Sequence, residues 1–246
     1  MSKPEYLKRT INKENISSEY LNEERSVRVY LPPGYNDLVS YPVVYAQDGQ
    51  DIFMYGRIAT LANELILDHG VDPFIIVGID VDKKHRTSEY STNGEKSEAY
   101  RSFVVKELIP FIEAHYPVKD SIGHRVLIGD SLGGTVSLDL AMDNPDFFSK
   151  VISLSGAYFE PTTEKLSNKK TLEHLDLWML VGTLETAVDT SMGTLDFLEW
   201  NRKTRATLEE KGAKVFYKEE EGDHIWGFWQ KELPEAIKYY FKPSFY

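Results

Sequence analysis

The sequence has 246 residues, a formal net charge of −11 at pH 7 and no cysteine. The lack of cysteine excludes disulfides, thiolate metal sites and a cysteine nucleophile, and the negative charge disfavours binding to nucleic acid or to an anionic membrane surface. No apolar run approaches the roughly 20 residues that span a bilayer, and the polar start at Met1–Tyr6 does not resemble a secretory signal, so we expect a cytoplasmic protein with a single domain over 1–246.

Strand-like runs alternate with helix-like runs along the chain. Ser26–Leu31 alternates polar and apolar residues, whereas later runs are almost continuously apolar, as in a sheet that is covered on both faces. The strands expected after it are Tyr41–Ala46, Pro73–Ile79, Arg125–Ile128, Lys150–Leu154, Leu177–Val181 and Val215–Tyr217. The helices expected are Ser97–Tyr116, Gly134–Met142, Thr194–Lys211 and Pro234–Phe241. This order predicts an α/β fold with a mostly parallel sheet and helices on both faces.

A serine lies at the corner between an expected strand and the helix that follows it. The segment Gly129-Asp130-Ser131-Leu132-Gly133 has glycine two residues away on each side of Ser131. This spacing fits a nucleophile elbow, in which a strained backbone exposes the serine hydroxyl. The alternative is an ordinary serine in a glycine-rich turn.

A serine nucleophile needs a base, and a histidine is the usual partner near neutral pH. His224 follows the last expected strand and precedes the last helix, so its loop opens at the same sheet edge as Ser131. We therefore predict that His224 is the base, the alternative being an exposed loop histidine.

The imidazole needs an acidic partner, which should follow the strand Leu177–Val181. Glu185 is the first carboxylate after that strand and our first choice, and Asp189 is the second choice. Two backbone N–H groups should stabilise the oxyanion. We assign them to Leu132, directly after the nucleophile, and to Gln50, in the Asp-Gly turn that follows Tyr41–Ala46.

Substrate contacts are expected from residues near these loops. Arg57 and Tyr90 lie in loops that could face the site, where a cation would suit an acidic or catecholate substrate. Solvated surface charge is the alternative reading for Arg57. Trp226 follows the expected base and would either pack against its loop or stack on substrate. The segment 156–175 would form a short cap.

Four parts of the chain together resemble the putative esterase family of the α/β-hydrolase fold, related to esterase D and enterochelin esterase. They are the Asp48-Gly49-Gln50 turn, the helix Phe103–Tyr116, the elbow with Gly134, and Gly222-Asp223-His224-Ile225-Trp226 with Trp229. The resemblance implies the same roles for Ser131, His224, Leu132 and Gln50. It places the acid at Glu185, although the family more often has aspartate there, which keeps Asp189 open.

The resemblance implies a serine carboxylesterase that works through an acyl-enzyme without metal or cofactor. The chain also lacks the His-Glu-x-x-His and Cys/His patterns of metal sites. The expected partner is a small intracellular ester, such as a siderophore ester or an acyl ester. The alternatives are an acyltransferase with the same triad and a non-catalytic binding module on a hydrolase scaffold.

Overall fold

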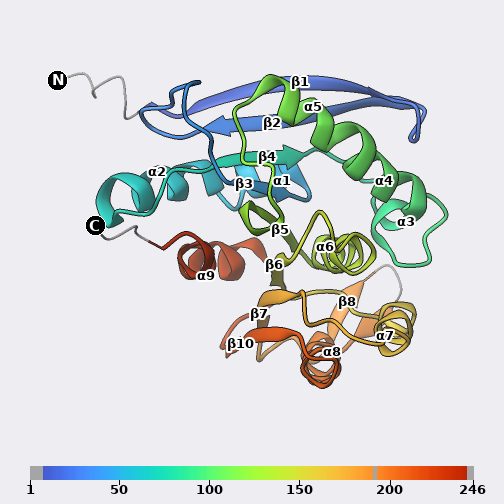
Figure 1. Cartoon of the computed structure of the whole chain (residues 1–246). Coiled ribbons are helices and arrows are strands. Elements are labelled where there is room, and N and C mark those ends of the chain that lie inside the picture. The colour runs from blue at the N-terminus through green and yellow to red at the C-terminus, as the bar shows by residue number, and fades with distance from the viewer. Residues whose placement is uncertain (1–7, 191–192, 243–246) are drawn as a thin grey trace.

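The computed structural model describes residues 8–190 and 193–242 (Figure 1). Its main sheet has eight strands in the order β1-β2-β4-β3-β5-β6-β7-β10, and β8 pairs with β9 in a separate hairpin. The strands are β1 (Thr10–Ser18), β2 (Glu23–Leu31), β3 (Val43–Ala46), β4 (Ile75–Ile79), β5 (Arg125–Asp130), β6 (Lys150–Leu154), β7 (Asp176–Gly182), β8 (Val188–Thr190), β9 (Gly193–Leu195) and β10 (Lys214–Glu220). β1 and β2 are antiparallel to each other, as are β2 and β4, whereas all other pairs in the main sheet are parallel.

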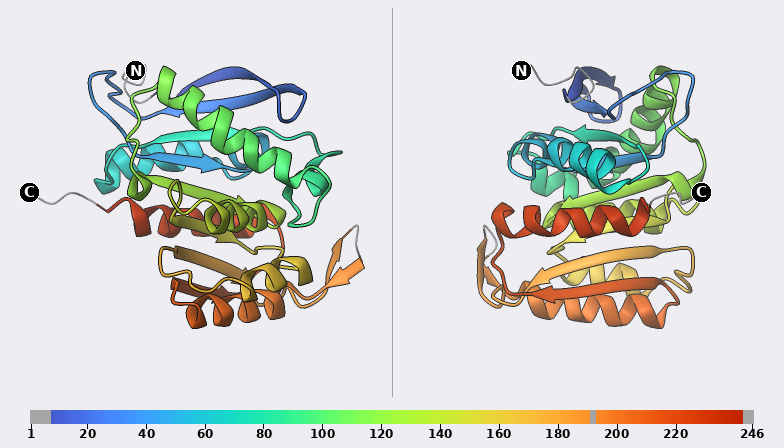
Figure 2. Two further views of the ribbon diagram at one scale, coloured as in Figure 1. Left: turned by 45° about the vertical axis from the view of Figure 1, so that its right-hand side comes forward. Right: turned by 90° about the vertical axis from the view of Figure 1, so that its left-hand side faces the viewer.

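Helices cover both faces of this sheet (Figure 2). One face packs against α1 (Gly49–Met54), α2 (Ile58–His69) and α9 (Trp226–Tyr240). The other face packs against α4 (Ser97–Phe103), α5 (Ile109–His115), α6 (Leu132–Asp143), α7 (Glu160–Ser167) and α8 (Phe197–Glu210), with α3 (Arg86–Tyr90) beside α4 and α6. The predicted mostly parallel α/β sheet with helices on both faces is confirmed.

The central strands are long apolar runs because both of their faces are buried. Every residue of β3, β4 and β5 is buried, and so is every residue of β6 and β7 after the first. The carboxyl ends of β3, β5, β6, β7 and β10 meet at one edge of the sheet, since these strands are parallel. This edge is where open α/β sheets place their sites.

Four local differences from the sequence expectations are seen, the first being that the last helix, α9, begins at Trp226 rather than at Pro234. β1 was not expected, because this edge strand has a largely exposed, polar sequence. The helix expected from Ser97 to Tyr116 contains a π-helical stretch, Val104–Leu108, between α4 and α5. The helix expected from Thr194 starts at Phe197 behind the N-cap Asp196, because Gly193–Leu195 is strand β9.

The segment 156–175 contains one short helix, α7, which packs against α6 and α8. Among the described residues, none of the helices combines the length and hydropathy that a membrane span requires. The single domain over 1–246 stays a prediction.

Candidate active site

Ser131 occupies the sharp turn between β5 and α6. Its φ of 52° and ψ of −122° lie in a region that non-glycine residues rarely adopt. The turn is held by the Ser131 N–H, which donates to the carbonyl of Leu154 at the end of β6 over 2.9 Å. A Cβ atom at Gly129 would lie 2.3 Å from the carbonyl carbon of Gly133, so the close approach of strand and helix requires glycine. The strained corner predicted from the sequence is confirmed.

The two expected oxyanion donors are backbone N–H groups at the starts of two helices. Leu132 is the first residue of α6 and Gln50 is the second residue of α1. Helix-starting N–H groups have no acceptor within the helix, and no acceptor elsewhere in the described part of the chain takes their place. The Gln50 side chain is bound to the main chain of Val81 by two hydrogen bonds of 3.0 and 3.1 Å. It therefore fixes the loop without using its own N–H.

Glu185 contacts His224 directly. His224 Nδ1 lies 2.6 Å from Glu185 Oε2, and the glutamate side chain is fully buried. The other carboxylate oxygen accepts hydrogen bonds from Ser155 Oγ at 2.6 Å and from the Gly182 N–H at 2.8 Å. The carboxylate is thereby held in one orientation, with one oxygen directed at the imidazole.

Asp189, the second choice for the acid, is not brought to His224. It lies on β8 with its side chain exposed, and its Oδ1 accepts a hydrogen bond from Thr194 Oγ1 at 2.7 Å. The main chain explains the separation, because the Glu185 carbonyl accepts a 2.9 Å hydrogen bond from the N–H of Phe197. The β8–β9 hairpin, which carries Asp189, therefore extends away from the site between Glu185 and Phe197, whose main chains are in contact.

Aromatic side chains fix the His224 ring. Its centroid lies 4.2 Å from that of Phe197 and 4.8 Å from that of Trp229, which meets it edge to face. Trp229 Nε1 also donates to Ser155 Oγ at 2.8 Å. Half-buried Trp226 packs edge to face on Trp229, so its observed role is packing around the histidine loop.

Sequence reasoning missed Ser155 and Phe197 as parts of this site. Ser155 follows β6 directly and has a positive φ of 48°. A polar residue after a strand was the available signal, and it is too common to identify a site. The hydrogen bond from Trp229 to Ser155 was also not expected.

An arginine joins the loop after β3 to the serine corner. Arg86 makes two hydrogen bonds to the buried Asp48 carboxylate, at 2.7 and 2.8 Å, and one to the Asp130 carbonyl at 3.3 Å. Burial raises the pKa of Asp130 to about 7, the Asp48 carboxylate adds to this rise, and Arg86 opposes it. Because Asp48 and Asp130 adjoin the two helix starts, Arg86 holds the two expected oxyanion donors in one framework.

The prediction that Tyr90 contacts substrate is wrong. Its side chain is fully buried, and its hydroxyl accepts a 3.2 Å hydrogen bond from the Asp48 N–H. The preceding charged loop gave no sign that α3 turns this ring into the core.

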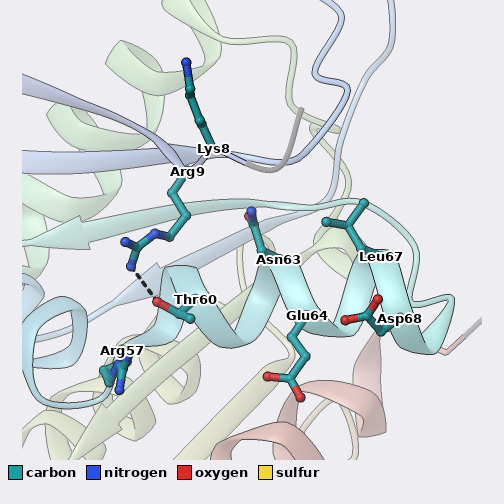
Figure 3. A pocket seen from close by; sticks show the side chains of 8 residues that line it. All are labelled: Lys8, Arg9, Arg57, Thr60, Asn63, Glu64, Leu67 and Asp68. Atoms are coloured by element: carbon teal, nitrogen blue, oxygen red, sulfur yellow. Dashed lines mark hydrogen bonds between the residues drawn. The ribbon is translucent and has the colours of Figure 1, made fainter. Parts of the chain in front are cut away.

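Arg57 is exposed and lines a polar hollow beside α2, together with Arg9 and Thr60 (Figure 3). The Arg9 guanidinium donates to Thr60 Oγ1 over 2.6 Å. Among the described residues, the lining of this hollow includes none from the loops after β5, β7 and β10, which carry Ser131, Glu185 and His224. The hollow is thus separate from the Glu185–His224 pair, although Gly56, the residue before Arg57, packs against Trp226.

The sheet order, the corner at Ser131 and the paired Glu185 and His224 define an α/β-hydrolase fold. Residues 18–240 match the family described as "Putative esterase". The chain is 38% identical to "Uncharacterized protein YjcH" of Bacillus subtilis over 231 residues, which cover 93% of this chain and 96% of the relative.

Two solved structures show the same fold. A ferulic acid esterase superposes with a TM-score of 0.82 at 18% identity, covering 96% of this chain and 98% of that one. The enterobactin esterase of Shigella flexneri superposes with a TM-score of 0.81 at 23% identity, covering 96% of this chain and 60% of that one. The chain belongs to the putative esterase family and is a carboxylic-ester hydrolase.

Proposed function

We propose that the chain hydrolyses a small carboxylic ester through an acyl-enzyme on Ser131, with His224 as base and Glu185 as acid. The observation that carries the proposal is the 2.6 Å contact between buried Glu185 and His224. It occurs in loops at the same sheet edge as the strained Ser131. Strain and burial of this kind are maintained where they position reacting groups.

In the first step, Ser131 Oγ attacks the ester carbonyl carbon while His224 Nε2 accepts the hydroxyl proton. Glu185 holds Nδ1–H, fixes the tautomer and stabilises the imidazolium that forms. The carbonyl oxygen becomes an oxyanion, for which Leu132 and Gln50 supply N–H donors. Nε2 then returns the proton to the alkoxy oxygen, the carbon–oxygen bond breaks and the alcohol leaves.

In the second step, water replaces the alcohol. His224 Nε2 takes a proton from water as its oxygen attacks the acyl carbon, and then returns that proton to Ser131 Oγ. The acid product leaves and the free enzyme is restored. Each proton that the base accepts is returned in the same half-reaction, so a single imidazole serves both halves.

The test is labelling by a fluorophosphonate, followed by intact-mass measurement and peptide mapping. We expect one adduct, on Ser131, and loss of both the adduct and p-nitrophenyl ester hydrolysis in Ser131→Ala. Ser167→Ala removes an exposed serine of α7 and serves as the matched control, with labelling and turnover retained. Turnover by a folded Ser131→Ala variant close to that of the unchanged chain would refute the proposal.

A further inference from the structure

A pocket is lined by Leu132, the residue that follows the proposed nucleophile Ser131. Its volume is about 330 Å³, at the small end of the range for small-molecule sites. It lies between the start of α6, the segment from β6 to α7, the β9–α8 junction and the polar segment Ser91–Asn93 that follows α3. Six residues give it an apolar wall: Leu132, Ala157, Phe159, Pro161, Leu195 and Trp200.

The wall is contributed by elements far apart in sequence and includes two aromatic rings. Phe159 and Trp200 meet edge to face, with centroids 6.4 Å apart. Leu195 lies on β9, in the β8–β9 hairpin between Glu185 and α8. An apolar wall next to a reacting serine favours an apolar substrate group, because water is displaced from both surfaces on binding.

The charges near this pocket disfavour an anionic substrate group. Glu160 is the charged residue among the described residues that line it, and its side chain is exposed. Lys165 and Lys169 line an adjoining hollow, but both bind the Asp143 carboxylate, at 2.7 and 3.2 Å. A carboxylate or an iron-bound catecholate would therefore meet a like charge, and the described residues of the pocket wall include no cation to offset it.

The position of the pocket also indicates which half of the ester it takes. The acyl group stays bonded to Ser131 after the alcohol leaves, so its site must adjoin the serine corner. The alkoxy oxygen must face His224 Nε2 to receive its proton. The described pocket wall includes Leu132 and Thr135 of α6 and no residue of the His224 loop, which favours the acyl half.

We propose that this pocket selects an uncharged, apolar acyl group larger than acetyl and rejects acyl groups that end in a negative charge. The inference rests on the proposed function, since it assumes an acyl group on Ser131. Such a preference would differ from that of an esterase whose substrate is an anionic iron-catecholate.

The test compares p-nitrophenyl hexanoate with p-nitrophenyl acetate and with the mono-p-nitrophenyl ester of adipic acid. The last compound keeps the six-carbon chain and replaces its terminal methyl group by a carboxylate. We expect kcat/KM to rise by up to about fourfold for each methylene added from acetate to hexanoate. We expect the adipate ester to react at least about tenfold more slowly than the hexanoate.

Leu195→Lys places a cation in the pocket wall and should raise the adipate-to-hexanoate ratio about tenfold. Thr194→Lys adds the same charge to the neighbouring, exposed position of β9 and should leave the ratio unchanged. Equal rates for all three esters, or the same ratio in both lysine variants, would overturn the inference.

Two further readouts separate the possible failures. A longer alcohol chain is tested by comparing hexyl acetate with ethyl acetate, and a longer acyl chain by comparing p-nitrophenyl hexanoate with p-nitrophenyl acetate. If only the longer alcohol chain raises the rate, the pocket takes the alcohol half and the acyl assignment is wrong. If Ser131→Ala still turns over p-nitrophenyl acetate, the proposed function fails. If Ser131→Ala is inactive and the unchanged enzyme shows no preference among the acyl groups, the inference alone fails.

Discussion

At the scale of single residues, the centre of the site is the Glu185 carboxylate. It accepts hydrogen bonds from a hydroxyl and a backbone N–H on one oxygen and contacts the imidazole with the other. A glutamate side chain is one methylene longer than an aspartate side chain. The Ser155 and Gly182 donors restrict that longer side chain to one position, and this restriction keeps Oε2 in contact with His224.

The role of Glu185 can be tested by its amide. Glu185→Gln keeps the size of the side chain but removes the charge that stabilises the imidazolium in the proposed mechanism. We expect kcat for a p-nitrophenyl ester to fall by about 10²- to 10⁴-fold. Asp189→Asn is the matched control and should keep kcat within about twofold, because Asp189 is exposed and bound to Thr194. The reverse order of losses would assign the acid to Asp189.

Ser155 should act as a positioning residue, because it reaches His224 through Glu185. Trp229 should act as a second one, because it donates to Ser155 and packs against the His224 ring. Ser155→Ala removes a hydrogen bond from the carboxylate and leaves Trp229 Nε1 without its acceptor. We expect kcat to fall about tenfold with little change in KM. Trp229→Phe in the Ser155→Ala background should add less than it costs alone, as coupled neighbours do. Fully additive losses in kcat would contradict this coupling.

At the scale of elements, the loops after β3 and β5 form one unit through Arg86. This arginine reaches the carboxylate of Asp48 and the carbonyl of Asp130, so a movement of either loop strains the other. One carboxyl group in this unit lowers the stability of the fold when it ionises. Asp130 is buried beside Asp48, and the upward shift of its pKa means that its ionisation opposes folding.

The pH dependence of stability follows from that shift. The folded pKa of Asp130, about 7, is above its ordinary value of 3.8, so its favourable contribution is complete below pH 3.8 and is lost as the pH rises through 7. Asp130→Asn removes this dependence. We expect the unfolding free energy of the variant minus that of the unchanged chain to increase between pH 5 and pH 8, by about 1 kcal/mol or more.

Urea unfolding at the two pH values measures this difference. Asp146→Asn alters an exposed carboxylate and serves as the control, with no such change expected. A difference for Asp130→Asn that stays constant with pH would show that this carboxyl does not titrate in the range given.

The central strands and their mostly parallel arrangement could be predicted because buried parallel strands have long apolar sequences. The position of these strands along the chain led to the expectation that Ser131, Glu185 and His224 lie at one sheet edge. Other elements gave no such signal. β1 has mostly polar, exposed side chains, and the pattern around Thr194 resembled a helix start although a β-hairpin ends there. The pocket wall was missed for the same reason, since it depends on where that hairpin and α7 meet α6.

At the scale of the whole molecule, a buried ion pair connects the antiparallel end of the sheet to the layer of helices. The guanidinium of Arg25 on β2 binds the Glu89 carboxylate of α3 at 2.8 and 3.0 Å, and both side chains are almost fully buried. Arg25 also lies over the rings of Tyr100 and Phe103. The pair connects the antiparallel part of the sheet to the side that holds the serine corner.

Removal of one partner should be costly, because the other charge is left buried. We expect Arg25→Met to lower the unfolding free energy by about 3 to 5 kcal/mol, and Arg25→Met with Glu89→Leu to recover much of it. Arg205→Ala breaks an exposed pair with Glu209 in α8 and should cost less than about 1 kcal/mol. Denaturant titration checks all three, and equal losses for Arg25→Met and Arg205→Ala would contradict the argument.

The backbone hydrogen bond between Glu185 and Phe197 has a consequence for how this protein could diverge. The chain leaves the site at Glu185 and returns at Phe197, with carbonyl and N–H only 2.9 Å apart. Residues inserted or deleted between these two points lengthen or shorten a closed loop, at a small entropic cost, without moving the acid. Because Leu195 lies in that loop, a descendant could acquire a new choice of ester through changes in loop length while its proton transfer stays intact.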